Sequence, residues 1–520
     1  MEAELVNSWI PGAIAFLPLL ATIGVFVLGD QRAQIRDGLV VITSAAVVVL
    51  AAAMYPAISA GHVLVSRIME LAPSLTMIFR VDVFGFYVTL IAAAVWFLVT
   101  IYSLGYMEGE HAQTRFYAFF LLTLSGALGS FMASDLFTLF MFFELMSLPA
   151  YVLVIHEQTP QAMRAGVKYL FMTIAGSLAF FFGLVAIQGM TGSLDLNQVG
   201  KITEAGPLAT GAFIAFVIAF GMKAGMVPLH VWLSDAHPVA PSPASALLSG
   251  VMLKTGAYGL FRVIYGIYGA EFFRAAGWST WLQIIAAVTI LLGSAVAITQ
   301  TDLKRRLAYS SIGQMGYILL AMGLMTERAM VGGAYHIFAH AVVKSCLFLS
   351  AGSIIRQTGL RDVRDFGGLG YRMPLTMACF TMCALTIAGI PPMNGFVSEW
   401  ALMQGAFDAG LPGYAVVLML SALMNAVYYF TIVITAYFGK PRHAEHVGEM
   451  HDEHGIIPHV TTEAPPQIIP KRHFQWLREA PPQMLVPMLI LATASVIFSL
   501  IPNNWPLEMA QQSAKLLLGR

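Results

Sequence analysis

Apolar stretches of about 20 residues recur from one end of this chain to the other, each long enough to cross a hydrocarbon core of roughly 30 Å as an α-helix. In lipid, the backbone polar groups of a spanning segment must be satisfied internally, which favours helices. Only 11% of the 520 residues are Asp, Glu, Lys or Arg, less than half of the roughly 25% found in soluble domains. The sequence therefore excludes a water-soluble fold and predicts an all-α polytopic membrane protein.

About fourteen transmembrane helices are expected, at roughly 36 residues for each helix and its loop. Residues 62–82 alternate weakly in polarity and contain a proline, which favours a hairpin outside the membrane. Residues 503–520 are short and amphipathic. The candidate spans are 10–28, 38–58, 83–106, 116–133, 135–155, 165–190, 207–227, 241–266, 279–300, 306–325, 330–355, 373–405, 412–438 and 484–501.

The positions of Lys and Arg predict the orientation of these spans, because cytoplasmic loops are enriched in both. Seventeen of the 28 Lys and Arg residues fall in one set of alternate loops, eight fall in the other set, and three lie within spans. This asymmetry predicts both termini on the extracytoplasmic side. It places the long polar segment 440–482 in the cytoplasm.

The three lysines within spans are Lys223, Lys254 and Lys344, and the spans also contain Glu144 and Glu399. A charge near the bilayer centre costs at least about 2.5–3.5 kcal/mol, so such residues indicate function by default. A structural interpretation of Glu144, as a carboxylate satisfied by a neighbouring hydroxyl or lysine, remains the alternative.

Two histidines precede the third of these lysines along the same span. His336, His340 and Lys344 are spaced i, i+4, i+8, which places all three on one face of a helix. Satisfied core histidines are the alternative interpretation. The alignment with a buried lysine favours a proton-handling role.

Residues 217–243 and 385–400 combine Gly and Pro in mid-span with a charged residue, Lys223 in one and Glu399 in the other. Pro removes a backbone donor, so each helix is expected to be discontinuous where it lines a hydrated cavity. Paired interruptions indicate two inverted five-helix repeats. The expected domains are 1–114 (N-terminal helices and extracytoplasmic hairpin), 115–266 and 280–438 (the repeats), 440–482 (a cytoplasmic His- and Pro-rich loop) and 484–520 (last helix and tail).

No cofactor or metal is expected in this chain. Its three cysteines lie in apolar runs, in a grouping unsuited to zinc or an iron–sulfur cluster. It has no Gly-rich nucleotide-binding motif, and the equal numbers of basic and acidic residues, 28 each, give no support for a nucleic-acid partner. Six of its histidines fall in 440–482 at irregular spacing, which favours a solvated loop over a metal site.

Several of these segments together resemble a known superfamily over roughly residues 80–440: FGMKAGMVPLHVWLSDAHPVAPSPASALLSGVMLKTG, TDLKRRLAYSSIGQMGY, HIFAHAVVKSCLFLSAG and GIPPMNGFVSEW, with the buried Glu144. The chain resembles the antiporter-like subunits of respiratory complex I, Mrp-type cation/proton antiporters and energy-converting hydrogenases. The resemblance implies that Glu144 pairs with Lys223 and that Lys254, His336, His340 and Lys344 carry protons onward. The route would end at Glu399, where many Mrp relatives have Lys.

The resemblance implies an ion-translocating subunit, with H⁺ as the ion, in a multisubunit redox-driven complex. Such a subunit performs no redox chemistry itself. The segment NGFVSEW is most similar to hydrogenase-type subunits. The expected partners are further antiporter-like and small membrane subunits, with iron–sulfur or hydrogenase-type peripheral subunits, in a prokaryotic inner membrane. The alternatives are a subunit of an Mrp-type Na⁺/H⁺ antiporter without redox partners and, more weakly, a stand-alone channel or transporter.

Overall fold

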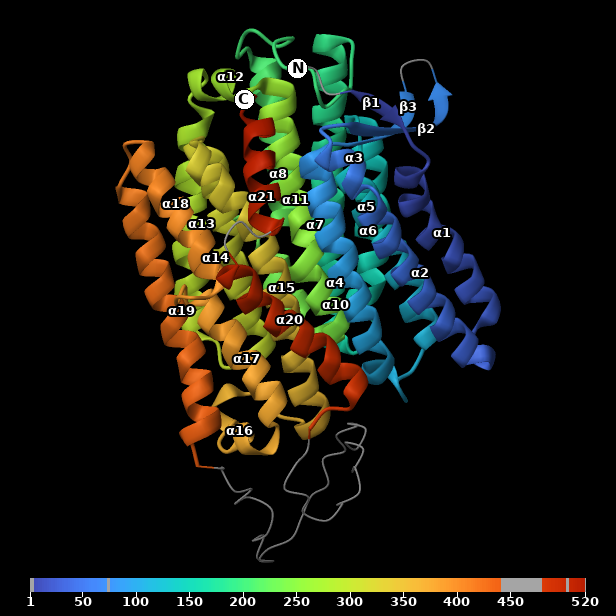
Figure 1. Cartoon of the computed structure of the whole chain (residues 1–520), viewed down its shortest axis with the longest axis vertical. Helices are drawn as coiled ribbons and strands as arrows, with labels where there is room; N and C mark the ends of the chain where they lie inside the picture. Colours follow the sequence, from blue (N-terminus) through green and yellow to red (C-terminus); the bar gives the residue numbers. More distant parts are fainter. Residues whose placement is uncertain (1–3, 73–74, 441–478, 502–504, 520) are drawn as a thin grey trace, which may run out of the picture.

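The computed structural model describes residues 4–72, 75–440, 479–501 and 505–519. Most of the described chain is helical (Figure 1). The first elements are β1 (Leu5–Asn7), α1 (Ile10–Leu28), η1 (Asp30–Arg32), α2 (Ala33–Ala53), α3 (Tyr55–Ser59), β2 (Val63–Ala72), β3 (Leu75–Val81), α4 (Val83–Met107), α5 (Gln113–Met132), α6 (Leu136–Val154), α7 (Pro160–Thr191), α8 (Pro207–Ala224), α9 (Val231–Val239), α10 (Ser242–Leu247) and the π-helical η2 (Leu248–Met252). They are followed by α11 (Leu253–Phe261), the π-helical η3 (Arg262–Tyr268), α12 (Ala270–Ala275), α13 (Trp278–Thr299), α14 (Leu303–Leu324), α15 (Glu327–Thr358), η4 (Val363–Asp365), α16 (Leu369–Arg372), α17 (Pro374–Ile387), α18 (Asn394–Asp408), α19 (Gly413–Phe438), α20 (Pro482–Leu500) and α21 (Trp505–Leu517).

The long helices form one bundle, and thirteen helical segments of the described chain are long and apolar enough to cross a membrane. The consecutive short helices α17 and α18 correspond to the expected span 373–405. The expected all-α, multi-pass membrane protein is therefore confirmed. The helices α14 and α15 lie at the centre, since their apolar windows are 94% and 100% buried, whereas α2, α19 and α20 expose most of theirs.

The two ends of the bundle differ. We call the end with β1–β3, α12 and α21 the sheet face. We call the opposite end, with α16, the end of α19 and the start of α20, the loop face (Figure 1). The expected loop 440–482 lies almost entirely outside the described residues. The expected side of the membrane for each face stays a prediction.

A three-stranded sheet lies where the sequence predicts a hairpin. Strands β2 and β3 pair in antiparallel register, and β1 adds to β2 in parallel. Asp82 follows β3 and accepts a hydrogen bond from the Gly85 amide, which caps α4. Its carboxylate also forms a buried bidentate pair with Arg262, at 2.6 and 2.7 Å, so that η3 is joined to the start of α4. Burial raises the pKa of Asp82, but the charge and hydrogen bonds of Arg262, the Gly85 amide and the Arg80 charge together outweigh burial, so the net pKa lies below its usual range.

Both helices predicted to be discontinuous are interrupted. Helix α8 ends at Ala224, one residue after Lys223, and Gly225 follows with a φ of +74°. Helix α17 ends at Ile387, and Gly389, with a φ of +69°, lies in the short break before α18 begins at Asn394. The indole of Trp232 on α9 donates to the Met222 carbonyl at 2.9 Å, which satisfies one backbone group freed at the first break.

The stretches 115–266 and 280–438 share several local features. Helices α7 and α15 are each 32 residues long and begin at a threonine N-cap. Helices α6 and α14 each begin at an aspartate N-cap, Asp135 and Asp302, and each aspartate forms an isolated β-bridge to a later aspartate. These features support the predicted repeats, but the domain boundaries and the inverted symmetry stay predictions.

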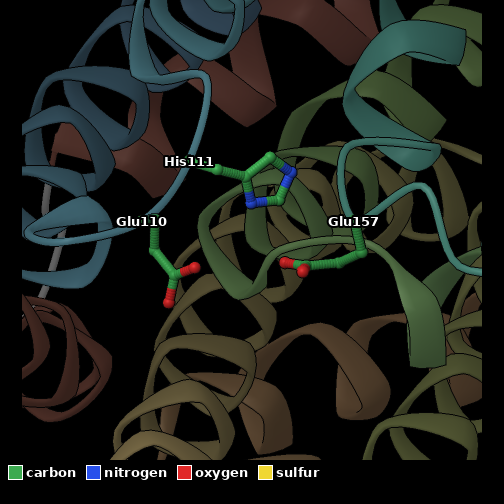
Figure 2. A group of neighbouring side chains, drawn as sticks. All are labelled: Glu110, His111 and Glu157. Carbon is green, nitrogen blue, oxygen red and sulfur yellow. The ribbon is translucent and has the colours of Figure 1, made fainter. Parts of the chain in front are cut away.

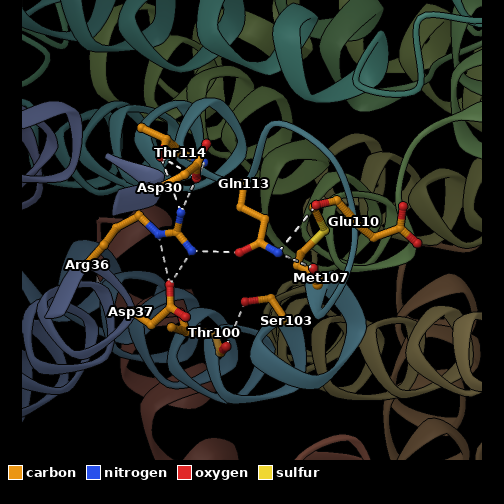
Figure 3. A network of polar contacts seen from close by, with 9 residues as sticks. All are labelled: Asp30, Arg36, Asp37, Thr100, Ser103, Met107, Glu110, Gln113 and Thr114. Atoms are coloured by element: carbon orange, nitrogen blue, oxygen red, sulfur yellow. Dashed lines mark hydrogen bonds and ion pairs between the residues drawn. The ribbon is translucent and has the colours of Figure 1, made fainter. Parts of the chain in front are cut away.

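A buried arginine organises the loop face around the start of α5 (Figure 3). Arg36 is fully buried, pairs with Asp30 and Asp37, and donates to the Gln113 side-chain oxygen at 2.7 Å. The Gln113 amide in turn donates to the carbonyls of Met107, at 2.8 Å, and Glu110, at 3.3 Å. This network fixes the turn between α4 and α5.

Helices α8 and α11 approach so closely that Gly256 has no room for a side chain, because a Cβ there would lie 2.5 Å from the Phe220 carbonyl oxygen. We expect Gly256→Ala to destabilise the fold by about 1–3 kcal/mol through overpacking. Gly189→Ala is the matched control, since it lies on the exposed side of α7 with nothing within 4 Å. The measurement is the thermal unfolding midpoint in detergent. Equal midpoints for the two variants would contradict this packing.

Candidate functional site

The seven predicted residues lie on five helices. Glu144 is on α6, Lys223 on α8, Lys254 on α11 and Glu399 on α18, while both histidines and Lys344 are on α15. Glu144 is partly exposed, and the other six are at most 4% exposed. The structure brings three of the seven, Lys254, His336 and His340, into direct contact, and Lys344 follows His340 by one turn of α15.

Lys254 and His340 are in direct contact. The Lys254 ammonium lies 2.6 Å from Nδ1 of His340 and donates to the Ser249 carbonyl, also at 2.6 Å. Ser249 belongs to the π-helical η2, and its hydroxyl bonds that of Ser311 at 2.7 Å. Single π-helical turns within α-helices are frequent at functional sites. Here the irregular turn supplies a carbonyl to a buried lysine.

The two histidines share one face of α15, as their i, i+4 spacing predicts, and their rings stack with centroids 5.8 Å apart. Nδ1 of His336 lies 2.9 Å from the Ser398 hydroxyl on α18, and its ring stacks on Tyr317 of α14. The second ring nitrogen, Nε2, of each histidine has no hydrogen-bond partner among the described residues. The pair connects the Lys254 region to α18.

Lys344 donates to neutral oxygens. Its ammonium bonds the Ser310 hydroxyl at 2.5 Å, the Tyr429 hydroxyl at 3.1 Å and the Leu307 carbonyl at 3.3 Å. The Tyr428 hydroxyl donates to the same Ser310 oxygen at 2.6 Å. Ser310 is therefore an acceptor shared by the lysine and by α19.

Lys223 and Glu144 are not within ion-pair distance, although each charge acts on the other at longer range, so their pairing stays a prediction. The Lys223 ammonium donates to the Tyr169 hydroxyl at 2.9 Å and lies 5.1 to 6.0 Å from the ring centres of Phe143, Tyr169 and Trp232. Glu144 instead accepts a hydrogen bond from Ser177 on α7 at 2.5 Å. Each group has a nearer partner, because α7 supplies a hydroxyl to both.

Glu399 lies against the break between α17 and α18. A Cβ at Gly389 would lie 2.2 Å from a Glu399 carboxylate oxygen, so the glycine makes room for the acid. The Oε1 atom of Glu399 has no hydrogen-bond partner in the part of the chain that the structure describes. The carboxylate is close enough to Tyr317 and Tyr428 to interact with both electrostatically. Hydrogen bonds join Lys344 through Ser310 to Tyr428, and the last step from Tyr428 to Glu399 is an electrostatic contact.

Several buried polar atoms beside this path have no partner among the described residues. They include both amide atoms of Gln314 on α14 and of Asn394 at the start of α18. Buried polar groups are normally satisfied by protein or by ordered water. The region between α14, α15 and α18 therefore holds buried polar groups that the described residues do not satisfy.

Sequence reasoning missed the hydroxyl groups that contact the charged residues. They lie on α7, α14, α18 and α19, and are Tyr169, Ser177, Ser310, Ser398, Tyr428 and Tyr429. The chain holds many serines and tyrosines, and no spacing distinguishes these six. Only the packing of the helices reveals them.

The family described as NADH:quinone oxidoreductase/Mrp antiporter, TM, matches residues 133–425. A second family, described as NADH-Ubiquinone oxidoreductase (complex I), chain 5 N-terminus, matches residues 71–117. The first match covers more than half of the chain and contains all seven residues. The chain belongs to this family. It is an antiporter-like membrane subunit, and the expected superfamily membership is confirmed.

Relatives in three branches of the superfamily match at similar identity. The chain is similar to the N subunit of NADH-quinone oxidoreductase from Desulforudis audaxviator, at 36% identity over 77% of each chain. It is 32% identical to a Na⁺/H⁺ antiporter subunit from Alkalihalophilus pseudofirmus, over 70% of this chain and 74% of the relative. It is also 32% identical to hydrogenase-4 component B of Escherichia coli, over 85% of this chain and 65% of the relative.

Two solved structures share the fold across 98% of each chain. One is a chain of the Mrp complex from Dietzia sp. DQ12-45-1b, with a TM-score of 0.84 and 24% identity. The other belongs to the membrane-bound sulfane sulfur reductase, an archaeal respiratory membrane complex, with a TM-score of 0.83 and 24% identity. At this identity the likeness establishes the fold.

Ser310→Ala removes the acceptor shared by Lys344 and Tyr428, so we expect ion transport to fall at least about tenfold, the effect of losing roughly one hydrogen bond to a charged group. Ser495→Ala is the control, because that serine is equally buried but bonds only its own helix on α20. The measurement is transport in vesicles at matched levels of assembled protein. Normal transport by Ser310→Ala would exclude this serine from the path.

Proposed function

We propose that this chain moves protons across the membrane through its buried lysines, histidines and Glu399, as the non-redox subunit of a redox-driven multisubunit complex. The observation that carries the proposal is a pair of contact groups on the two sides of α15. Lys254 contacts His340, and Lys344 is joined through Ser310 to Tyr428, beside Glu399. Each of these side chains can hold or pass a proton.

The cost of burying the lysines supports this function. A charge at the membrane centre costs at least about 2.5–3.5 kcal/mol, and Lys223, Lys254 and Lys344 are each at most 1% exposed. Among the described residues, none of the three has a carboxylate within ion-pair distance, since their partners are hydroxyls, carbonyls and an imidazole. Neutral partners stabilise both the protonated and the neutral lysine, as a proton carrier requires.

The order of transfer that fits these contacts starts at Lys223 and proceeds through Lys254, the histidine pair and Lys344 to Glu399. Among the described residues no hydrogen bond joins Lys223 to Lys254, where α8 and α11 pack backbone to backbone at Gly256, and none joins His340 to Lys344 or Tyr428 to Glu399. We propose that water bridges these gaps. Water also fits beside Gln314 and Asn394, because their side-chain amide atoms have no partner among the described residues.

The excess of Lys and Arg in the loops of the loop face supports a cytoplasmic position for this face, with both termini extracytoplasmic. We place the protein in a prokaryotic inner membrane. Its proposed partners are further antiporter-like and small membrane subunits, with iron–sulfur or hydrogenase-type peripheral subunits. The relatives in NADH-quinone oxidoreductase and hydrogenase-4 support this assembly.

Membership of an Mrp-type Na⁺/H⁺ antiporter is the second candidate, supported by the relative from Alkalihalophilus pseudofirmus. Purification of the intact complex separates the two functions. Co-purifying iron–sulfur subunits and proton uptake driven by a reductant would support the first. A complex of membrane subunits alone, whose proton flux depends on Na⁺, would support the second.

Glu144→Gln keeps the acceptor for Ser177 but removes the one acidic charge predicted to act on Lys223. We expect ion translocation to be abolished or strongly reduced while assembly stays normal. Glu271→Gln, at an exposed position on α12, is the control. Proton flux in vesicles is the measurement, and full activity of Glu144→Gln would contradict a role for this carboxylate.

Glu399→Ala removes the terminal carboxylate, and we expect it to lose nearly all transport. Glu399→Lys introduces the residue type found in Mrp-type relatives and keeps a group that binds and releases a proton, so partial transport is expected. The two variants are compared in vesicles with equal amounts of complex. If alanine supports as much transport as lysine, the route ends elsewhere.

A further inference from the structure

A cluster of potential metal ligands lies at the loop face, separate from the buried lysines (Figure 2). Glu110 and His111 belong to the turn between α4 and α5, and Glu157 belongs to the turn between α6 and α7. One ligand atom from each residue lies within 4.8 Å of the others. Two loops that are distant in sequence therefore bring two carboxylates and an imidazole together.

The imidazole of His111 is oriented for ligation. Its Nε2 atom lies 3.0 Å from the carbonyl oxygen of His156. A carbonyl only accepts hydrogen bonds, so Nε2 carries the hydrogen, and in the neutral ring the lone pair is on Nδ1. In Figure 2 this second nitrogen faces the space between the Glu110 and Glu157 carboxylates. A carbonyl bonded to the far nitrogen is the usual support of a metal-binding histidine.

Both turns are held by hydrogen bonds to other elements. Arg356 of α15 donates to the carbonyls of Tyr106 and Glu108, each at 2.5 Å, and the Arg115 side chain donates to the His156 carbonyl at 2.8 Å. Gln113 fixes the Glu110 carbonyl from the other side (Figure 3). The ligands are thus positioned before any ion binds.

The backbone beside the cluster is unusual. Among the described residues, three other than glycine have a positive φ, and two of them directly follow a ligand: Ala112 (+49°) after His111 and Gln158 (+54°) after Glu157. Such conformations cost about 1–3 kcal/mol each and collect at functional sites. Both turns therefore carry strain where they present their ligands.

Positive charges already act on the cluster, since Arg356 donates to Oε1 of Glu110 at 3.1 Å and the Lys304 and Arg361 charges act on Glu157 at longer range. A carboxylate has about four lone-pair sites, so this contact leaves acceptor capacity on Glu110. The Glu157 carboxylate has no ion-pair partner within the described part of the chain. A cation between the acids would relieve their mutual repulsion.

We propose that Glu110, His111 and Glu157 bind one divalent transition-metal ion, for which Zn²⁺ is the best chemical match. Zinc accepts imidazole nitrogen together with carboxylate oxygen and tolerates a water in its fourth position. Magnesium and calcium prefer sites built from oxygen alone. Bound metal would join the α4–α5 turn to the α6–α7 turn, beside a cavity of about 400 Å³ that Glu157, Lys304 and Arg361 line.

The test measures Zn²⁺ binding to the purified full-length chain, which needs no transport activity. The six histidines of 440–482 (His443, His446, His451, His454, His459 and His473) are first replaced by Asn, so that they add no background. In this chain we expect one equivalent of Zn²⁺ to bind and to raise the thermal unfolding midpoint, because a ligand that binds only the folded state stabilises it.

His111→Ala and Glu157→Gln should each weaken this binding at least about tenfold, the loss typical even of groups that only support a ligand. Glu108→Gln, an exposed acid in the same turn, is the matched control and should bind normally. Unchanged unfolding midpoints without metal show that the variants fold. Either no binding by the parent chain or undiminished binding by both ligand variants would overturn the proposal.

Discussion

The burial of three lysine ammonium groups with no carboxylate of the described residues in contact is the constraint on which the rest of the interior depends. An ammonium group that is removed from water must find acceptors in the protein. In this chain those acceptors are Tyr169 for Lys223, a π-helical carbonyl and His340 for Lys254, and Ser310 with Tyr429 for Lys344. Helices α7, α14, α15 and α19 are therefore held in register by polar contacts as well as by apolar packing.

The irregular segments occur where those acceptors are needed. A regular helix uses its own carbonyls, whereas the π-helical turn before Lys254 offers the Ser249 carbonyl to the lysine. The break after α17 brings Gly389 against the Glu399 carboxylate, which a side chain at that position would displace. These irregularities cost helical hydrogen bonds, and the structure places them beside the charged groups and not at random along the spans.

The sequence predicts the features that follow from one segment at a time. Apolar length predicts the spans, Gly and Pro predict both breaks, and the i, i+4 spacing predicts the shared helix face of His336 and His340. The sequence does not predict contacts between segments, such as the hydrogen bond from Lys344 to Ser310 or the separation of Glu144 from Lys223. The Glu110–His111–Glu157 cluster is of the same kind, because its members become neighbours only when two loops meet. No sequence pattern predicts that these two loops lie next to each other.

Glu144 differs from the other six residues in a way that bears on control. It is the one member that remains partly exposed on the surface of the bundle, and its hydrogen bond runs to α7 and not to a lysine. Among the described residues no hydrogen bond joins Lys223 to Lys254, because backbone packing at Gly256 leaves no room for a side chain there. In the proposed function, a neighbouring protein covering α6 and α7 would therefore change the surroundings of Glu144, the predicted partner of Lys223, more directly than those of the six buried residues.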